Sequence, residues 1–137
     1  MTILSFRLQD DLSKAVREIE RCLGEGCVAL IPTETFYGLA CDPWSEEGVG
    51  RVLRLKDRPR NMALPVLAGN WSQVDRLTCV PEKWRARLEA LWPGPVTAVL
   101  PTRADLPAAL PGTVAVRIPG HPLLRQLLVE TGPLTGT

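Results

Sequence analysis

The chain has 137 residues, of which 45% are apolar and 23% are charged, and its formal net charge at pH 7 is +1. This length and composition are typical of one globular domain with a core of its own, and they exclude a disordered chain. The near-neutral charge argues against a generally basic nucleic-acid-binding protein, although it allows a local cationic site. No apolar run approaches the roughly 18 residues of a membrane span, and the N-terminus lacks the apolar core of a signal peptide, so we expect a cytoplasmic protein without membrane contact.

The cysteines predict neither a metal site nor a disulfide framework. Cys22, Cys27, Cys41 and Cys79 contain no C-x-x-C pair, and the chain has a single histidine, His121. This spacing matches no zinc-binding pattern, and one histidine cannot complete one. We therefore expect buried, reduced thiols.

The N-terminal part predicts a strand followed by a helix. We expect a short first strand over Leu4–Leu8. Asp10 or Asp11 then caps a helix that ends at Gly24 and Gly26, because glycine accepts left-handed backbone angles. The apolar residues that recur there at helical spacing are Leu12, Ala15, Val16, Ile19 and Leu23.

Two buried strands and a second helix are expected next. The run 27–31 has the length and β-branched content of a buried strand. Ser45, followed by two glutamates, predicts a helix start, and that helix stops near Lys56 because the Arg-Pro pair after it cannot continue a helix. The segment 63–68 reads as another buried strand, which Pro65 places at a sheet edge or a bulge.

The second half continues the alternation of helices and strands. Pro81 suits a first helical position, and Trp84, Leu88 and Leu91 form the stripe of that helix. The expected elements that follow are a rigid turn at 92–95, a strand at 96–100, a proline-rich loop at 101–112, a strand at 113–118 and a helix at 122–130. The chain is therefore predicted to be one α/β domain with a mixed sheet, spanning residues 1–137.

A polar loop follows the strand that Pro32 ends. Thr33, Glu34, Thr35 and Tyr37 lie within five residues there. Open α/β sheets place ligands at such strand ends, so a ligand-binding loop is one interpretation. A polar hairpin turn is the other, and local chemistry alone does not separate the two.

A basic segment lies between residues 51 and 60. Its five cations oppose a single acidic residue, Asp57, in a chain that is otherwise nearly neutral. Cations on a stiff turn suit phosphate, with lysine acting as a point charge and arginine as a planar fork. A solvated helix face is the alternative, which charge alone favours. The cations are Arg51, Arg54, Lys56, Arg58 and Arg60.

Arg117 stands in an otherwise apolar strand and needs a partner, because burying an unpaired charge is costly. That partner is either an anionic ligand or a carboxylate such as Glu34.

His121 is expected to cap the last helix rather than to act in catalysis. Trp84 and Trp92 are interpreted as core and turn anchors rather than as a platform for stacking bases. No G-x-S-x-G or G-x-x-x-x-G-K-[ST] motif is present, which disfavours an α/β-hydrolase and a P-loop NTPase.

Four ordered segments resemble the signature of the TsaC/YrdC family of threonylcarbamoyl-AMP synthases. They are Pro32-Thr33-Glu34-Thr35-Phe36-Tyr37-Gly38-Leu39, Lys56-Asp57-Arg58-Pro59, Trp92-Pro93-Gly94-Pro95-Val96-Thr97, and the segment from Val114 to Pro122, which reads VAVRIPGHP. The resemblance extends from about residue 10 to the last residue. It implies an open twisted mixed α/β sheet, similar to the DHBP-synthase-like fold, around a large positively charged cavity.

The resemblance also implies the reaction. L-threonine, bicarbonate or carbon dioxide, and ATP give threonylcarbamoyl-AMP and pyrophosphate, and partner proteins then transfer the group to an adenosine of certain tRNAs. Lys56 and Arg58 are the implied catalytic cations and hold the triphosphate with Mg²⁺, together with Thr137. Thr33, Thr35 and Tyr37 are implied for threonine. Arg117 pairs with either the threonine carboxylate or a phosphate. No organic cofactor, enzyme-bound metal or covalent nucleophile is expected.

The sequence departs from the family in two places. Arg60-Asn61-Met62-Ala63-Leu64 stands where the family usually has a stretch that contains lysine or histidine. The S-A-N motif expected after Thr137 is absent from the sequence. If the chain is complete, we expect an uncovered sheet edge, weak nucleotide binding and a tendency to dimerise. Two other interpretations stay open: carbamoyl-adenylate chemistry like that of hydrogenase maturation, and a non-catalytic module that contacts double-stranded RNA.

Overall fold

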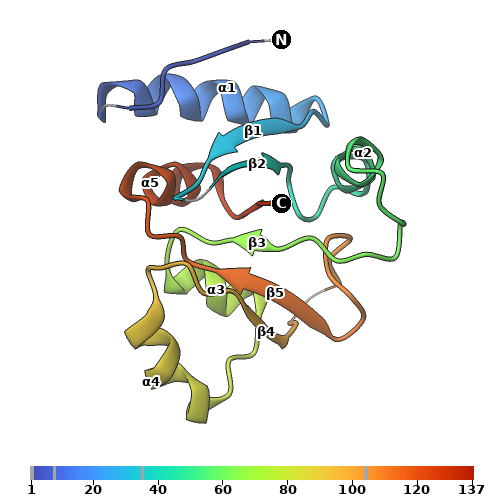
Figure 1. Cartoon of the computed structure of the whole chain (residues 1–137), viewed down its shortest axis with the longest axis vertical. Coiled ribbons are helices and arrows are strands. Elements are labelled where there is room, and N and C mark those ends of the chain that lie inside the picture. The colour runs from blue at the N-terminus through green and yellow to red at the C-terminus, as the bar shows by residue number, and fades with distance from the viewer. Residues whose placement is uncertain (1, 8, 35, 104) are drawn as a thin grey trace.

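The computed structural model describes residues 2–7, 9–34, 36–103 and 105–137, in which helices alternate with short strands (Figure 1). The helices are α1 (Leu12–Gly24), α2 (Glu46–Leu55), α3 (Trp71–Leu77), α4 (Glu82–Leu91) and α5 (Pro122–Thr131), with a 3-10 helix at Gln9–Asp11. The strands are β1 (Ala29–Pro32), β2 (Tyr37–Ala40), β3 (Val66–Leu67), β4 (Ala98–Pro101), β5 (Thr113–Arg117) and β6 (Leu134–Thr135).

The strands form a hairpin and a mixed sheet. β1 and β2 pair antiparallel, and the second sheet has the order β4-β5-β3-β6. β3 runs parallel to β5, whereas the pairs β3–β6 and β4–β5 are antiparallel. The prediction of an α/β protein with a mixed sheet is confirmed.

The C-terminal residues join the hairpin to the mixed sheet. On one side β6 pairs with β3. On the other side the Thr135 N–H donates to the Cys41 carbonyl at 2.9 Å, and the Leu39 N–H donates to the Thr137 carbonyl at 2.8 Å. Figure 1 accordingly shows the C-terminus in the middle of the molecule, between β2 and β3. The edges of the described sheet are therefore β1 and β4, and the last strand is an interior one.

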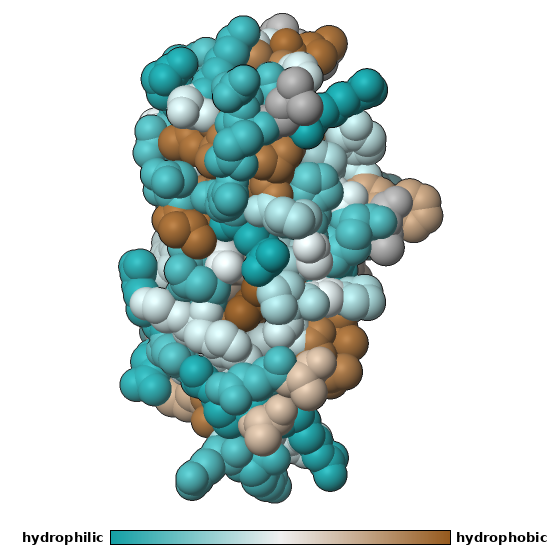
Figure 2. Space-filling view, turned by 90° about the vertical axis from the view of Figure 1, so that its left-hand side faces the viewer, coloured by the Kyte–Doolittle hydropathy of each residue, from teal (hydrophilic) through white to brown (hydrophobic). Residues whose placement is uncertain are grey.

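Alternation along the strands divides the apolar residues between two clusters. Val66, Val116 and Cys41 belong to a core that α2 and α3 also contribute to. Leu67 and Leu134 belong to a second cluster together with residues of α1 and α5. On the face shown in Figure 2, which includes α5, hydrophilic residues predominate and apolar ones form separate patches.

Several local predictions are confirmed with their mechanism. The Ser45 hydroxyl accepts a hydrogen bond from the Gly48 N–H at 3.0 Å and so caps α2, which ends before Lys56. Gly26 adopts a φ of 64° after α1, as its predicted role at the helix end requires. His121 caps α5, because its Nδ1 accepts from the Leu124 N–H at 3.2 Å.

The N-terminal predictions are partly wrong. Residues 4–7 form no strand, and Leu8 lies outside the described residues. Asp11 occupies the cap position of α1 but does not cap it, because its carboxylate accepts from the Ser5 hydroxyl and the Arg7 N–H at 3.1 and 2.9 Å. The run 27–31 is only partly buried, since Leu30 is 62% exposed on the edge strand β1.

Two predictions about the middle of the chain are also wrong. Of the edge and the bulge predicted for Pro65, the edge is wrong, because Pro65 precedes β3, an interior strand whose ladder does not need the missing proline N–H. Trp84 and Leu91 of α4 are 43% and 46% exposed, so only Leu88 of the predicted stripe is buried. Trp84 is thus no core anchor, whereas Trp92 is buried at 4% exposure.

The cysteines differ in burial. Cys41 is buried, Cys22 and Cys27 are half-buried, and Cys79 is exposed, so the prediction of burial holds fully for Cys41 alone. Among the described residues, no three histidine, cysteine or carboxylate side chains gather as a metal site would require. Within the same residues, no helix is both long and apolar enough to cross a membrane.

Candidate active site

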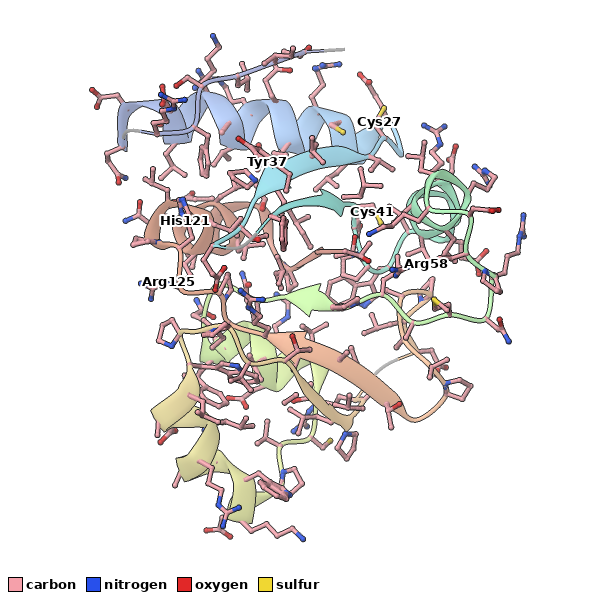
Figure 3. All side chains as sticks on the ribbon, in the orientation of Figure 1. Cys27, Tyr37, Cys41, Arg58, His121 and Arg125 are labelled. Atoms are coloured by element: carbon pink, nitrogen blue, oxygen red, sulfur yellow. The ribbon has the colours of Figure 1, made fainter. Side chains whose placement is uncertain are left out.

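Two cations and one hydroxyl meet where α2 ends. Asp57 adopts a φ of 50°, and the Arg58 N–H returns to the Leu53 carbonyl at 2.9 Å, so the chain turns sharply after the helix. Lys56 Nζ then donates to the Thr137 hydroxyl at 3.3 Å, and Arg58 Nη1 donates to the same oxygen at 3.1 Å. The turn thus brings together three residues that the sequence analysis assigned to phosphate. Figure 3 shows Arg58 between α2 and the middle of the molecule.

The electrostatics of this cluster favour an anion. Burial, followed by repulsion from Arg58, lowers the pKa of the Lys56 ammonium. Within the described part of the chain, no aspartate or glutamate side chain pairs with Lys56 or Arg58, and the hydroxyl of Thr137 that both donate to carries no charge. Two adjacent positive charges without a counter-ion are suited to a phosphate.

The rest of the basic segment lies on the surface. Arg51 pairs with Glu47 at 2.6 Å across one helical turn, and Arg54 and Arg60 are exposed. The interpretation as a solvated helix face therefore fits these three cations, whereas Lys56 and Arg58 turn inward and share the Thr137 hydroxyl. A cavity of about 450 Å³ lies beside Arg51 and Arg54, and its lining includes neither Lys56 nor Arg58.

Some polar groups of the β1–β2 loop form hydrogen bonds within the loop itself. The Thr33 hydroxyl donates to the Phe36 carbonyl at 2.6 Å and lies 3.2 Å from the Phe36 N–H, which donates to it. Tyr37 begins β2 on the hairpin and is 70% exposed (Figure 3). Thr35 lies outside the described residues. The roles of Thr33, Thr35 and Tyr37 toward threonine stay predictions.

Arg117 finds the carboxylate partner that the sequence analysis considered. At the end of β5 its Nη2 faces Glu34 Oε1 in an ion pair, and its Nε donates to the Gly94 carbonyl at 3.0 Å. The Gly120 N–H donates to the same carboxylate oxygen at 2.8 Å. Burial acts to raise the pKa of Glu34, but the hydrogen bonds from Arg117 and Gly120 outweigh it and leave that pKa below its ordinary value.

The sheet holds these two groups of residues apart. Arg117 shares a row with Leu67 and Leu134, and Thr137 lies three residues beyond Leu134. Standard strand spacings put Arg117 and Thr137 about 10 Å apart across the sheet and about 10 Å apart along it. The structure therefore presents two cationic positions rather than one cluster. β2 links them, because it leaves the loop of Glu34 and pairs with Thr137 through Leu39.

Sequence reasoning missed the backbone partners of this second position. The Gly94 carbonyl and the Gly120 N–H complete the surroundings of Arg117 and Glu34. Both glycines lie in segments already singled out as motifs, W-P-G-P and R-I-P-G-H-P. Glycine at both positions is the available signal, because it permits close approach of the backbone.

The fold and these residues define an α/β protein with a mixed sheet, in which Lys56 and Arg58 lie on one side of β3 and the Arg117–Glu34 ion pair lies on the other. The model of the Sua5/YciO/YrdC family, described as "Telomere recombination", matches residues 21–137. The threonylcarbamoyl-AMP synthase of Stutzerimonas stutzeri is 41% identical over 126 residues, which cover 89% of this chain and 68% of that protein. The synthase of Pseudomonas aeruginosa strain UCBPP-PA14 is 45% identical over 121 residues, covering 85% of this chain and 65% of that protein.

A solved structure agrees with these relatives. P. abyssi Sua5 complexed with L-threonine superposes with a TM-score of 0.83 at 28% identity, covering 99% of this chain and 42% of Sua5. The chain belongs to the Sua5/YciO/YrdC family. The family and the fold predicted from the four motifs are thereby confirmed. The chain spans about two thirds of the length of the two curated relatives and about two fifths of Sua5.

Proposed function

We propose that this chain, as one YrdC-like domain over residues 1–137, makes L-threonylcarbamoyl-AMP from L-threonine, bicarbonate or carbon dioxide, and ATP, with release of pyrophosphate. The observation that carries the proposal is the convergence of Lys56 and Arg58 on the Thr137 hydroxyl, which leaves two positive charges without a counter-ion among the described residues. The names of the curated relatives and the threonine bound to Sua5 give the proposal its substrates.

Lys56 and Arg58 bind the phosphates of ATP in this proposal. Lysine supplies a compact charge and arginine a planar fork of donors, so the pair stabilises charge that develops as pyrophosphate leaves. Both cations donate to the Thr137 hydroxyl in this structure. When ATP binds, a phosphate oxygen replaces that hydroxyl as their acceptor. Mg²⁺ enters with ATP as part of the substrate, since its usual partners are substrate phosphates.

Arg117 is the proposed partner of the threonine carboxylate. It lies on the far side of β3 from Thr137, and a separation on the order of 14 Å suits a ligand that extends from a triphosphate to an amino acid. Thr33, Thr35 and Tyr37 are the further residues that we assign to threonine.

The chemistry needs alignment more than covalent help. The neutral threonine amine attacks the carbon of carbon dioxide and releases a proton, or attacks that of bicarbonate with loss of water, and either route gives a carbamate. A carbamate oxygen then attacks the α-phosphorus of ATP, and the bond between that phosphorus and the oxygen of the leaving pyrophosphate breaks. Holding the reactants in line and stabilising the leaving pyrophosphate account for such a reaction without an enzyme adduct. Partner proteins in the cytoplasm then transfer the threonylcarbamoyl group to tRNA.

The test is pyrophosphate release from Mg²⁺–ATP with bicarbonate, measured with and without L-threonine, alongside calorimetric binding of each substrate. We expect release that requires threonine. If the chain binds neither ATP nor threonine, the proposal is overturned. Retention of double-stranded RNA that falls steeply with salt, with no threonine-dependent release, would replace it with the RNA-binding interpretation.

A further inference from the structure

Two cysteines meet where α1 ends. Gly26 adopts a φ of 64°, the Cys27 N–H donates to the Cys22 carbonyl at 2.8 Å, and the Gly26 N–H donates to the Leu23 carbonyl at 3.0 Å. These two hydrogen bonds and the left-handed glycine form a Schellman motif, whose first and last residues commonly place their side chains in contact. Both of those residues are cysteines here, so the end of the helix brings two thiols together.

The geometry of this pair permits a disulfide. Standard bond lengths and the 2.8 Å hydrogen bond put the two Cα atoms no more than about 6.7 Å apart, and disulfides join Cα atoms that are roughly 4.4–6.8 Å apart. Both thiols are free and half-buried. Burial, followed by the neighbouring Cys27 thiol, raises the pKa of Cys22 to about 11. The two sulfur atoms are therefore close neighbours that are not covalently joined in this structure.

Cys27 also borders a cavity. This cavity of about 450 Å³ lies between the residues that lead into β1 and the C-terminal half of α2, and Figure 3 shows Cys27 near that helix. The volume is typical of pockets that admit small molecules. Cys22 is not among the described residues that line the cavity, so Cys27 is the thiol that an entering molecule meets. The lining consists of Cys27, Val28, Arg51, Arg54 and Leu55.

We propose that Cys22 and Cys27 form a redox-modification site, at which a small-molecule disulfide of the glutathione type oxidises the two thiols to an intramolecular disulfide. The Cys27 thiolate attacks one sulfur of the small disulfide, whose S–S bond breaks and releases the first small thiol. The Cys22 thiolate then attacks the Cys27 sulfur of the mixed disulfide and expels the second small thiol. Two protein thiols thus lose two protons and two electrons, which reduce the small disulfide to two thiols.

This modification site goes beyond the proposed function and is separate from the residues that carry it. Neither Lys56 nor Arg58 lines the cavity beside Cys27. The thiol chemistry needs no ATP, threonine or turnover. Its test therefore stands whether or not the chain makes threonylcarbamoyl-AMP.

The test equilibrates the reduced chain with about 1 mM reduced and about 0.1 mM oxidised glutathione, and then blocks the remaining thiols with N-ethylmaleimide. Cleavage after glutamate separates the two cysteines, because Glu25 lies between them. Cys22 is then in the peptide 21–25 and Cys27 in the peptide 26–34, and neither peptide contains another cysteine. Mass spectrometry detects the disulfide as these two peptides joined with the loss of two hydrogens.

We expect at least about half of the chain to yield the joined peptides, because the helix end gives each thiol a high effective concentration toward the other. The exposed Cys79 is the internal reference. It should carry glutathione in only about one-tenth of the chain, since a mixed disulfide follows the ratio of oxidised to reduced glutathione. In concentrated urea, which unfolds the Schellman motif, the joined fraction should fall severalfold.

Two serine variants separate the steps. Cys22→Ser should stop at the mixed disulfide on Cys27, to about the extent seen at Cys79, because the second attack is lost. Cys79→Ser is the matched control and should leave the joined fraction unchanged. Recovery of Cys22 and Cys27 as free thiols or as two separate mixed disulfides would overturn the proposal. So would a joined fraction that is the same in urea, because the helix end would then contribute nothing to the pairing.

Discussion

The hydrogen bonds of Thr135 hold β6 in place two residues before Thr137, which makes Thr135 a sharp test of the fold. Thr135 is fully buried, and its hydroxyl accepts from the Cys41 N–H at 2.9 Å. The two residues are 94 positions apart in the sequence, and Cys41 is also fully buried. Thr135→Val keeps the shape of the side chain but leaves that N–H without a partner.

The expected loss of stability in Thr135→Val follows from the burial of Thr135 and Cys41. An unsatisfied buried donor costs about 1–3 kcal/mol, and no water reaches the Cys41 amide to compensate. For a domain of this size, each kcal/mol lowers the Tm by roughly 3–5 °C. Thr135→Ser keeps the hydroxyl and loses one methyl group, so it should cost about 1 kcal/mol through the lost packing.

The stability of both variants is measured by urea denaturation and by thermal denaturation, each followed by circular dichroism. We expect Thr135→Val to be less stable than Thr135→Ser. Mg²⁺–ATP binding should weaken with it, because Thr137 follows two residues after the end of β6. A Thr135→Val variant within about 0.5 kcal/mol of the original chain would refute the role assigned to this bond.

Three further predictions follow from the packing and the charges. Gly69→Ala places a Cβ 2.8 Å from the Arg125 carbonyl in α5, so it should destabilise the fold by about 1–3 kcal/mol, measured by urea denaturation. The Cβ of the control Gly24→Ala meets no atom within 4 Å, so this variant should not lose stability. Equal losses of stability in the two variants would contradict this prediction. The folded pKa of Glu34 lies below 4.5, so its ionised form contributes stability above that pH and loses it as the pH falls through the folded pKa. The Tm advantage of the original chain over Glu34→Gln should therefore shrink as the pH falls from 7 through the lowered pKa of Glu34, and a constant difference would argue against it. The pKa of Lys56 is lowered from 10.5, so the affinity for phosphate should begin to fall below pH 10.5 as the ammonium loses its proton. Lys56→Arg should extend phosphate binding to higher pH, because arginine stays charged there. Identical pH profiles of phosphate affinity for the original chain and Lys56→Arg would contradict a role for the lysine charge.

Local signals in the sequence predicted the elements that local chemistry determines. Ser45 and the Arg-Pro pair after Lys56 bounded α2 correctly, because capping and proline sterics act over a few residues. The helix α3 was missed although Asn70 and Gln73 have capping-box spacing, and the Asn70 side chain does accept from the Gln73 N–H at 3.0 Å.

Long-range pairing accounts for what the sequence could not predict. Nothing in residues 134–137 indicates that they lie between β2 and β3, because that placement depends on partners at residues 39–41 and 65–67. The Trp84 stripe of α4 has helical spacing, but spacing does not say whether a neighbouring element covers it. For the site, charge pattern indicated Lys56 and Arg58, whereas the separation of Arg117 from them follows only from the strand order.

The central claim is that Lys56 and Arg58 hold the phosphates of ATP in a threonylcarbamoyl-AMP synthase. The most direct test is mass-spectrometric detection of threonylcarbamoyl-AMP after incubation with Mg²⁺–ATP, L-threonine and ¹³C-bicarbonate. The account predicts a labelled product from the original chain, loss of it in the Lys56→Ala, Arg58→Ala double variant, and retention in an Arg54→Ala, Arg60→Ala control. Product formation that survives removal of Lys56 and Arg58, or its absence together with unchanged ATP binding by the double variant, would contradict the account.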